Sequence, residues 1–429
     1  MQEALKSHLP LPPPSTHVKA LPGVTSASVP PTVECKPTKG LVATTNVSTM
    51  IVARPPMSPK VSFDVEKDPT DAALANASNF CFLNATLHCL FRSPQFLTSL
   101  HRSMYARDRR LSTDTKETCC WYLMETGFAM KEDKDGCVDV VRLGLASAMK
   151  ACSTLINVPR QDQQDAEECL TFFLDILNEV TKAPVSIVVD DGDTRDLMQE
   201  IRASSSIHPE SYSHLVTQLA DASWAEHSAR NPSFITQQFV GQIVRGSSCH
   251  RCQRLSCHLQ EMSVLSLGLH TATSAMSLES CLDHFKDIEE MTNDNQVWCS
   301  PCQDKTNQRI QTLLLRLPPC LVVQLKRFTW ASGSGKNGAP VYFPVHRLNM
   351  APYLFERTRD AFYHLYAVCA HLGSSLGAGH YVAYCRLRAT HTTSIWLKYD
   401  DEHVTIVDEP TMLEETLCSA YLLFYERIP

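Results

Sequence analysis

Four cysteines of the sequence form two pairs with the spacing of metal-binding knuckles. Cys249 and Cys252 make one Cys-x-x-Cys pair, and Cys299 and Cys302 make the other. Two such pairs supply the four thiolates of a tetrahedral site, which leaves no open position for catalysis. Because residues 253–298 separate the pairs, a β-rich excursion must bring them together. We predict one structural zinc ion; the alternative is four unrelated cysteines in a chain that has 18.

Cys81 is the candidate nucleophile. It follows the turn-favouring residues Asn76–Asn79 and stands at the start of an apolar segment that predicts a helix. The positive end of a helix dipole favours a thiolate, and free backbone N–H groups there stabilise an oxyanion. The alternative is that Cys81 is a small buried hydrophobe, which is common for free cysteines.

A nucleophilic cysteine needs a base, and the base needs an orienting group. His380 lies between a glycine-rich stretch and the predicted strand Tyr381–Cys385. Asp400 and Asp401 follow another apolar strand, and an acid there is expected to accept the Nδ1 proton of His380. The alternative for the two acids is a solvated turn. His371 is a rival base, but we interpret it as a hydrogen-bonded structural histidine.

The segments that must position these residues divide into a helical half and a strand-rich half. Residues 81–93 and 164–180 predict helices with apolar faces, and residues 184–233 predict a polar loop or insertion. From Phe234 onward the apolar pattern has a period of two, which predicts strands. The alternating stretches are Phe239–Ile243, Leu265–Leu269, Leu321–Leu325, Tyr366–Ala370 and Tyr381–Cys385. Helices followed by strands favour an α+β fold.

Composition narrows the classes of function. The first 60 residues hold 11 of the 25 prolines, so residues 1–61 predict a disordered tail rich in Pro, Ser and Thr. The net charge of −7 argues against a nucleic-acid binder. No apolar stretch is long enough to span a membrane, and no secretory signal is recognisable. We therefore expect an intracellular protein, cytoplasmic or nuclear or both, whose clustered cysteines bind metal or do chemistry.

Seven blocks of the sequence stand in the order that is typical of one enzyme family. They are NASNFCFLNATLHCL, QQDAEECLTFFLDIL, FVGQIVRGSSCHRC, WCSPC, LPPCLVVQLKRF, GHYVAYC and WLKYDDEHV. Together they resemble the ubiquitin-specific proteases, which are papain-like cysteine peptidases that cleave ubiquitin from conjugates. The resemblance covers roughly residues 72–427, nearly all of the chain outside the tail. One block alone would be weak, but seven in order are specific.

The resemblance implies a role for each residue that matches a family position. Cys81 matches the nucleophile, His380 the general base and Asp400 the third member of the triad. Asp401 matches an adjacent acid that supports the oxyanion side, and Asn76 matches the asparagine of the oxyanion hole. The implied partner is ubiquitin or a ubiquitinated protein, with another ubiquitin-like modifier as an open alternative. The sequence leaves the oligomeric state open.

Two further residue sets follow from the same resemblance. One set lies beside the tail of the substrate in this family: Gln163, Gln164, Asp165 and Glu168. Its alternative role is the polar face of a helix. The other set is that of the zinc ligands, which are the four cysteines named above.

The family also implies the architecture, a hand with a helical thumb, zinc-tipped β fingers and a β palm. The thumb is expected at about residues 72–233, the fingers at about 234–315 and the palm at about 316–429, within one catalytic domain of residues 72–429. Phe80 replaces the threonine that usually precedes the nucleophile, and His88 replaces a glutamine. If Phe80 blocked the cleft, the chain would be a catalytically silent ubiquitin-binding adaptor, which is the alternative function.

Overall fold

The computed structural model describes twelve stretches of the chain. They are residues 72–76, 79–93, 95–106, 114–132, 137–152, 164–183, 212–271, 274–329, 335–356, 361–375, 378–387 and 395–429. The predicted tail, residues 1–61, lies outside them, and so do residues 184–211 of the predicted insertion.

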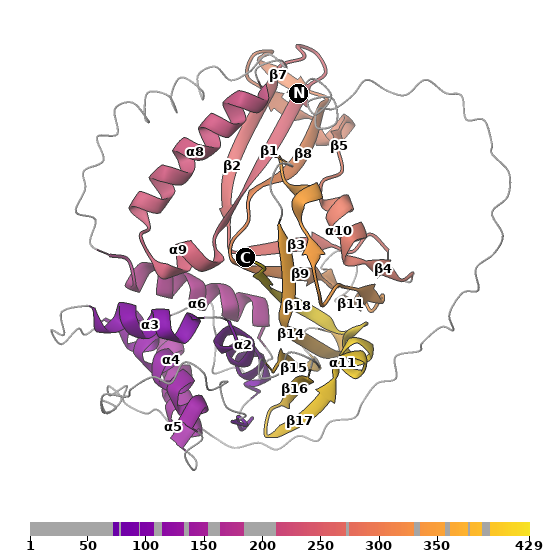
Figure 1. Cartoon of the computed structure of the whole chain (residues 1–429). Coiled ribbons are helices and arrows are strands. Elements are labelled where there is room, and N and C mark those ends of the chain that lie inside the picture. The colour runs from indigo at the N-terminus through magenta and orange to yellow at the C-terminus, as the bar shows by residue number, and fades with distance from the viewer. Residues whose placement is uncertain are drawn as a thin grey trace.

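Helices dominate the N-terminal half of the described chain; most lie together beside a large sheet, and the long helix α8 lies apart, along a second sheet (Figure 1). Their bounds are α2 Cys81–Phe91, α3 Phe96–Tyr105, α4 Thr115–Glu132, α5 Cys137–Cys152, α6 Ala166–Val180, α8 Tyr212–Arg230 and α9 Phe234–Phe239. The predicted helices at 81–93 and 164–180 are therefore confirmed as α2 and α6, each shifted by a few residues at its ends.

The helix α2 is the central element of the fold. Its 11 residues are all buried, because it packs against α6 on one side and against strands of the large sheet on the other. Its segment contains no Gly or Pro, and Thr86 turns its hydroxyl back to the carbonyl of Phe82 at 2.8 Å. A polar side chain is thus satisfied inside the buried helix.

The large sheet has eight strands in the order β17-β16-β15-β14-β18-β9-β3, with β13 paired to β14. The bounds are β3 Val264–Gly268, β9 Cys320–Lys326, β13 Leu348–Asn349, β14 Phe362–Ser375, β15 Ala378–Arg386, β16 Ile395–Asp400, β17 His403–Asp408 and β18 Ala420–Arg427. Successive residues of β9 face opposite cores: Cys320 and Val322 pack with the helices, whereas Leu321 and Val323 pack on the far face. Both faces of the sheet are therefore buried.

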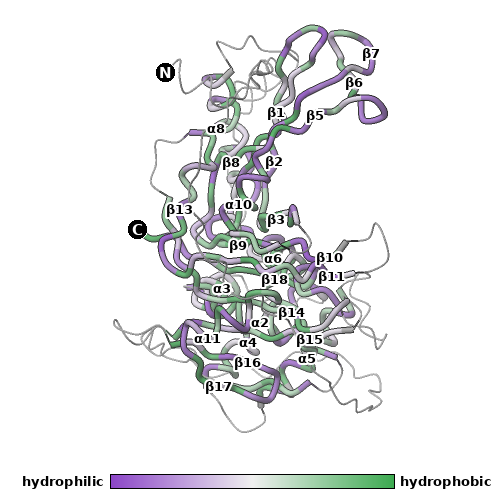
Figure 2. The backbone as a smooth tube through the Cα atoms, turned by 90° about the vertical axis from the view of Figure 1, so that its right-hand side faces the viewer, coloured by the Kyte–Doolittle hydropathy of each residue, from purple (hydrophilic) through white to green (hydrophobic). Residues whose placement is uncertain are grey.

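A second sheet of four strands, in the order β2-β1-β8-β5, carries a small hairpin, β6-β7, near its end. Their bounds are β1 Gly241–Cys249, β2 Leu255–Met262, β5 Glu289–Met291, β6 Val297–Cys299, β7 Asp304–Thr306 and β8 Gln308–Arg316. Figure 2 shows this region projecting away from the rest of the molecule. The smaller elements are β4 Met276–Ser277, α10 Leu278–Phe285, η1 Asn293–Asn295, β10 Phe328–Thr329, β11 Gly335–Lys336, β12 Val341–Tyr342, η2 Ala351–Tyr353 and α11 Glu409–Thr416.

Helices and sheets in this arrangement confirm the predicted α+β class, although two local predictions were wrong. Phe239 ends the helix α9 and does not begin a strand; the strand starts at Gly241. Residues 212–230 form the helix α8, which packs against β2, where a loop was predicted. Among the described residues, no helix combines the length and the apolar character that crossing a bilayer requires.

Candidate active site and metal centre

His380, Asp400 and Asp401 lie together where β15 begins and β16 ends, two strands of the large sheet that pack against α2. His380 lies inside β15, opposite Leu372 of β14, so the predicted strand begins earlier than Tyr381. Asp400 ends β16, and Asp401 starts the turn to β17 with a left-handed backbone (φ 52°). The Nε2 atom of His380 is 2.7 Å from Oδ1 of Asp400 and 3.6 Å from Oδ2 of Asp401.

The ring nitrogen that meets the acid is the opposite of the one expected. We predicted that Asp400 would accept the Nδ1 proton, but the structure places Nε2 against the carboxylate. Asp400 ends β16, the neighbour of β15, and its carboxylate lies beside Nε2 of the ring. Nδ1 is the nitrogen that remains for Cys81.

The electrostatics of this group favour a charged imidazole. Hydrogen bonds to Asp400 and to the Cys81 thiol raise the pKa of His380 to about 10, although burial opposes the shift. The same bond to His380 lowers the pKa of Asp400 below its ordinary value. The pair is therefore an imidazolium and a carboxylate over the neutral range.

Cys81 is the first residue of α2 and is buried. The turn before it depends on Asn79, whose backbone is left-handed (φ 57°), a conformation that asparagine tolerates. Phe80 follows, and its carbonyl accepts the first helical hydrogen bond, from Asn84, at 2.8 Å. The thiol thus lies where the dipole and the free N–H groups of the helix act.

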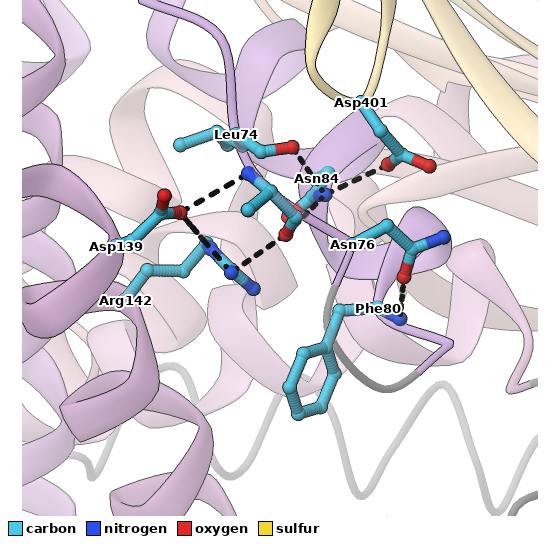
Figure 3. A network of polar contacts seen from close by, with 8 residues as sticks. Leu74, Asn76, Phe80, Asn84, Asp139, Arg142 and Asp401 are labelled. Atoms are coloured by element: carbon cyan, nitrogen blue, oxygen red, sulfur yellow. Dashed lines mark hydrogen bonds and ion pairs between the residues drawn. The ribbon is translucent and has the colours of Figure 1, made fainter. Parts of the chain in front are cut away.

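Phe80 is directed away from this site. Its side chain is only 7% exposed, and Figure 3 shows its ring on the opposite side of the chain from Asp401. The guanidinium of Arg142 lies over the ring at 5.4 Å from its centroid. The bulk of Phe80 is therefore accommodated among the helices.

The side chain of Asn76 is oriented by the same turn. Its Oδ1 accepts a hydrogen bond from the backbone N–H of Phe80 at 2.8 Å, so its amide N–H₂ points the other way (Figure 3). An amide held in this sense presents its two N–H groups as donors on the side of Asp401, whose carboxylate receives a hydrogen bond from it.

Asp401 joins the strand side of the site to the helix side. Its Oδ1 accepts from Nδ2 of Asn84 at 2.8 Å (Figure 3). Its carbonyl accepts from the backbone N–H of Leu74 at 3.1 Å. Burial raises the pKa of Asp401, while hydrogen bonds from Asn84 and Asn76 and the charge of His380 oppose the rise. Asn84 was not predicted, although it lies three residues after Cys81 on one helix.

His371 is structural, but not in the way we expected. It is fully buried, and neither ring nitrogen has a hydrogen-bond partner among the described residues. Its ring packs edge-on against Phe328 and Tyr381, with centroids 5.1 and 4.7 Å away. Burial, together with the charge of Lys336, lowers its pKa to about 3, so it stays neutral.

The acidic block at the start of α6 is divided between capping the helix and facing solvent. Asp165 caps the helix by accepting from the N–H of Glu167 at 2.7 Å, and Tyr421 donates to both of its carboxylate oxygens at 2.8 Å. Its side chain is thus engaged within the protein. Glu168 is exposed, Gln164 is half-buried, and Gln163 lies outside the described residues.

The four cysteines of the two pairs converge at the end of the projecting sheet. Sγ of Cys249 is 3.9 Å from Sγ of Cys302, and Sγ of Cys252 is 3.8 Å from that of Cys299, with all four within 4.8 Å of one another. Four sulfurs about 2.3 Å from one zinc ion at tetrahedral angles lie about 3.8 Å apart. The residues present therefore fit zinc.

The hydrogen bonding of Cys249 also suits a metal ligand. Burial raises its pKa, but bonds from the hydroxyl of Thr306 and from the N–H groups of Cys252 and Arg251 bring the pKa down to about 6. Backbone N–H groups that point at a ligand thiolate are a common second layer of such sites.

Comparison with known proteins identifies the family. The family model described as ubiquitin carboxyl-terminal hydrolase matches residues 72–425. The chain therefore belongs to the ubiquitin carboxyl-terminal hydrolase family, in its ubiquitin-specific protease branch, and the predicted resemblance is confirmed.

Relatives in animals align over most of this chain. Ubiquitin carboxyl-terminal hydrolase Usp2 of Drosophila melanogaster is 30% identical over 365 residues, which are 84% of this chain and 35% of that protein. Ubiquitin carboxyl-terminal hydrolase 2 of Rattus norvegicus is 28% identical over 367 residues, which are 83% of this chain and 54% of that protein. The matched region is thus about a third to a half of these two relatives.

Solved structures share the fold. A SAGA DUB module bound to monoubiquitin matches with a TM-score of 0.61 and 21% identity, covering 83% of this chain and 69% of that chain. The SAGA Ubp8/Sgf11/Sus1/Sgf73 DUB module bound to ubiquitin aldehyde matches with a TM-score of 0.60 at 21% identity, with the same coverage of both chains. The predicted hand-like fold of this family is therefore confirmed.

Proposed function

We propose that this chain is a catalytically competent thiol protease that hydrolyses the bond after the C-terminal glycine of ubiquitin in conjugates. The observation that carries the proposal is the His380–Asp400 contact of 2.7 Å beside a cysteine at a helix N-terminus. The family match and the ubiquitin complexes of its structural neighbours support ubiquitin as the partner.

The proposed mechanism uses four side chains. The Sγ of Cys81, a thiolate that has given its proton to His380, attacks the glycine carbonyl, and the Asn76 amide and the N–H groups at the start of α2 stabilise the oxyanion. His380 gives its proton to the leaving amine as the C–N bond breaks, which leaves a thioester. It then takes a proton from water, whose oxygen adds to the carbonyl as the C–S bond breaks. Asp400 orients the ring throughout.

The buried position of Phe80 supports turnover over silent binding. A side chain packed under Arg142 leaves the approach to Cys81 unobstructed by its ring. The other family positions keep their proposed roles, with Asp401 supporting the oxyanion side and the exposed Glu168 near the substrate tail. Zinc held by the four clustered cysteines would fix the end of the finger region. The limits given above for thumb, fingers and palm remain predictions.

The test is reaction with ubiquitin that carries a C-terminal electrophile, read by mass. We expect the wild-type chain to gain one ubiquitin mass and Cys81→Ala to gain none, while both bind ubiquitin. Binding without any adduct would favour the silent adaptor. Neither binding nor an adduct would direct the search to other ubiquitin-like modifiers.

A further inference from the structure

The chain segment that carries Asn76 is held by a pair of charged residues outside the predicted site. Asp139 and Arg142 lie one turn apart on α5, on a part of the thumb that none of the family blocks covers. Both side chains bind the backbone of the same residue, Ala75, which directly precedes Asn76; Figure 3 shows their hydrogen bonds. We call Asp139 and Arg142 the α5 clamp.

The α5 clamp satisfies both backbone groups of Ala75. Its N–H donates to Oδ1 of Asp139 at 3.1 Å, and its carbonyl accepts from Nη2 of Arg142 at 2.7 Å. The two clamp residues also bind each other, with Nη2 of Arg142 3.2 Å from the same Oδ1. The two bonds hold the two successive peptide groups on either side of the Ala75 Cα, and so restrain the backbone just before Asn76.

The α5 clamp also reaches the other side of Asn76. The guanidinium of Arg142 lies over the ring of Phe80, whose N–H donates to Oδ1 of Asn76. Arg142 therefore contacts residues on both sides of the amide, one through a hydrogen bond and one through a cation–π contact. The family's usual threonine has no aromatic ring for such a contact, so the Phe80–Arg142 pair is a feature of this chain.

The burial of these groups indicates that the arrangement is rigid. Arg142 is fully buried, and Asp139 is its charge partner with 38% of its side chain exposed. A guanidinium taken out of water is stable only while its partners stay in place, so the geometry resists distortion. Asn84 adds a third contact to the segment by donating to the carbonyl of Leu74 at 3.3 Å.

We propose that Asp139 and Arg142 are positioning residues that hold Ala75 and Phe80 and so aim the Asn76 amide at the oxyanion. The proposal rests on the proposed function above. It assigns the α5 clamp a role in the transition state and none in ubiquitin binding. A displacement of about 1 Å near a reacting centre costs on the order of 10²-fold in rate.

The test is a double-mutant cycle on kcat and KM, with a ubiquitin C-terminal fluorescent amide as substrate. Arg142→Met keeps the volume and removes the charge, and we expect kcat to fall about 10- to 100-fold with KM within about twofold. In an Asn76→Ala background the same substitution should lower kcat less than about threefold, because its target is gone. Lys150→Met is the control: it also replaces a positive charge of α5 by methionine, but at an exposed position, and it should leave both constants unchanged.

A second readout separates positioning from general structural support. Ubiquitin aldehyde forms a tetrahedral adduct with the nucleophile, whereas free ubiquitin does not. Arg142→Met should weaken binding of the aldehyde about tenfold or more and leave binding of ubiquitin unchanged. If Arg142→Met does not fold, as a thermal melt would show, Asp139→Ala replaces it, since Asp139 is partly exposed.

Each outcome bears on the proposal. Equal losses of kcat with and without Asn76, or a loss confined to KM, would overturn the positioning role while leaving the proposed function intact. Unchanged kcat in Asp139→Ala would overturn it as well. A wild-type chain that neither cleaves the amide nor reacts with the aldehyde would instead refute the proposed function, and the positioning role with it.

Discussion

The substitution Gly379→Ala should displace His380, the proposed base, because the added methyl group has no room. A Cβ at residue 379 would lie 2.2 Å from both Cε1 and Nε2 of His371 and 2.5 Å from the carbonyl oxygen of Leu372. Contacts this short force something to move. The ring of His371 has little room, because it is fully buried between Phe328 and Tyr381.

The strain would act directly on His380. Gly379 precedes His380 in β15, and Leu372, whose carbonyl the methyl group would meet, is the cross-strand partner of His380. Overpacking of a rigid core costs typically about 1–3 kcal/mol, and two clashing groups place this site at about 3 kcal/mol. In a domain of about 150–250 residues a loss of this size lowers the melting temperature by about 6–12 °C. The fall expected here is near the lower end of that range, because this domain is larger. A shift of His380 by about 1 Å should lower kcat on the order of 10²-fold.

Thermal melts and steady-state kinetics on the ubiquitin amide measure both effects. Gly268→Ala is the matched control, since its Cβ would meet nothing within 4 Å and should leave stability unchanged or slightly raised. Adding His371→Ala to Gly379→Ala removes the ring and should recover part of the activity. Wild-type stability and kcat in Gly379→Ala would refute the reasoning. A lower melting temperature with wild-type kcat would refute the route from strain to His380.

Two further predictions concern charge and metal. Asp400→Asn removes the largest cause of the raised pKa of His380, so the alkaline limb of the kcat/KM profile should move to lower pH from about 10. The folded pKa of His380 is raised and that of Asp400 is lowered, so the pair stabilises the fold fully between the ordinary pKa values of aspartate and histidine, about 3.9 and 6.5. This stabilisation is lost as the pH rises towards 10, and it is also lost in acid as Asp400 is protonated. The difference in the free energy of unfolding between wild type and Asp400→Asn should follow that course and stay within about 1 kcal/mol, since both side chains are partly exposed. Identical pH profiles would contradict the assignment. Metal analysis should give about one zinc per chain, and chelation or Cys302→Ser should remove it and lower the melting temperature. A metal-free wild-type chain with an unchanged melting temperature would contradict the zinc site.

Local pattern predicted the elements in which apolar spacing is dense. The helix α2 is rich in apolar residues and contains no Gly or Pro, and β9 and β14 contain apolar runs, so their type was predictable. The residues Cys320–Val323 at the start of β9 are all apolar, which is the pattern of a strand buried on both faces, whereas the predicted period of two accounted for one face only. By contrast, α8 buries only a few large apolar residues, among them Val216 and Leu219, so its helical period was hidden in a polar stretch.

The parts of the site that escaped prediction depend on contacts between distant segments. Asp139 and Arg142 are three residues apart on a helix, which as a sequence pattern indicates an ordinary surface ion pair. Their partner Ala75 lies 64 residues before Asp139 and contributes only backbone atoms, which carry no sequence signal. The contact between His380 and Asp400 likewise joins two neighbouring strands, from residues that lie 20 positions apart in the sequence.

The adjacent acids Asp400 and Asp401 have different contacts and opposite pKa shifts, because the chain turns between them. Asp400, at the end of a strand, meets His380 and its pKa falls; Asp401, with a left-handed backbone, turns inward, and burial raises its pKa. Asp401 then spans from His380, 3.6 Å away, to Asn84, 2.8 Å away, on the helix of the nucleophile. In the proposed mechanism Asp400 therefore sets the charge and orientation of the His380 ring, whereas Asp401 sets the distance between that ring and α2. A site built from two segments more than 300 residues apart needs both, since a correctly charged imidazole is useful only where the thiol can reach it.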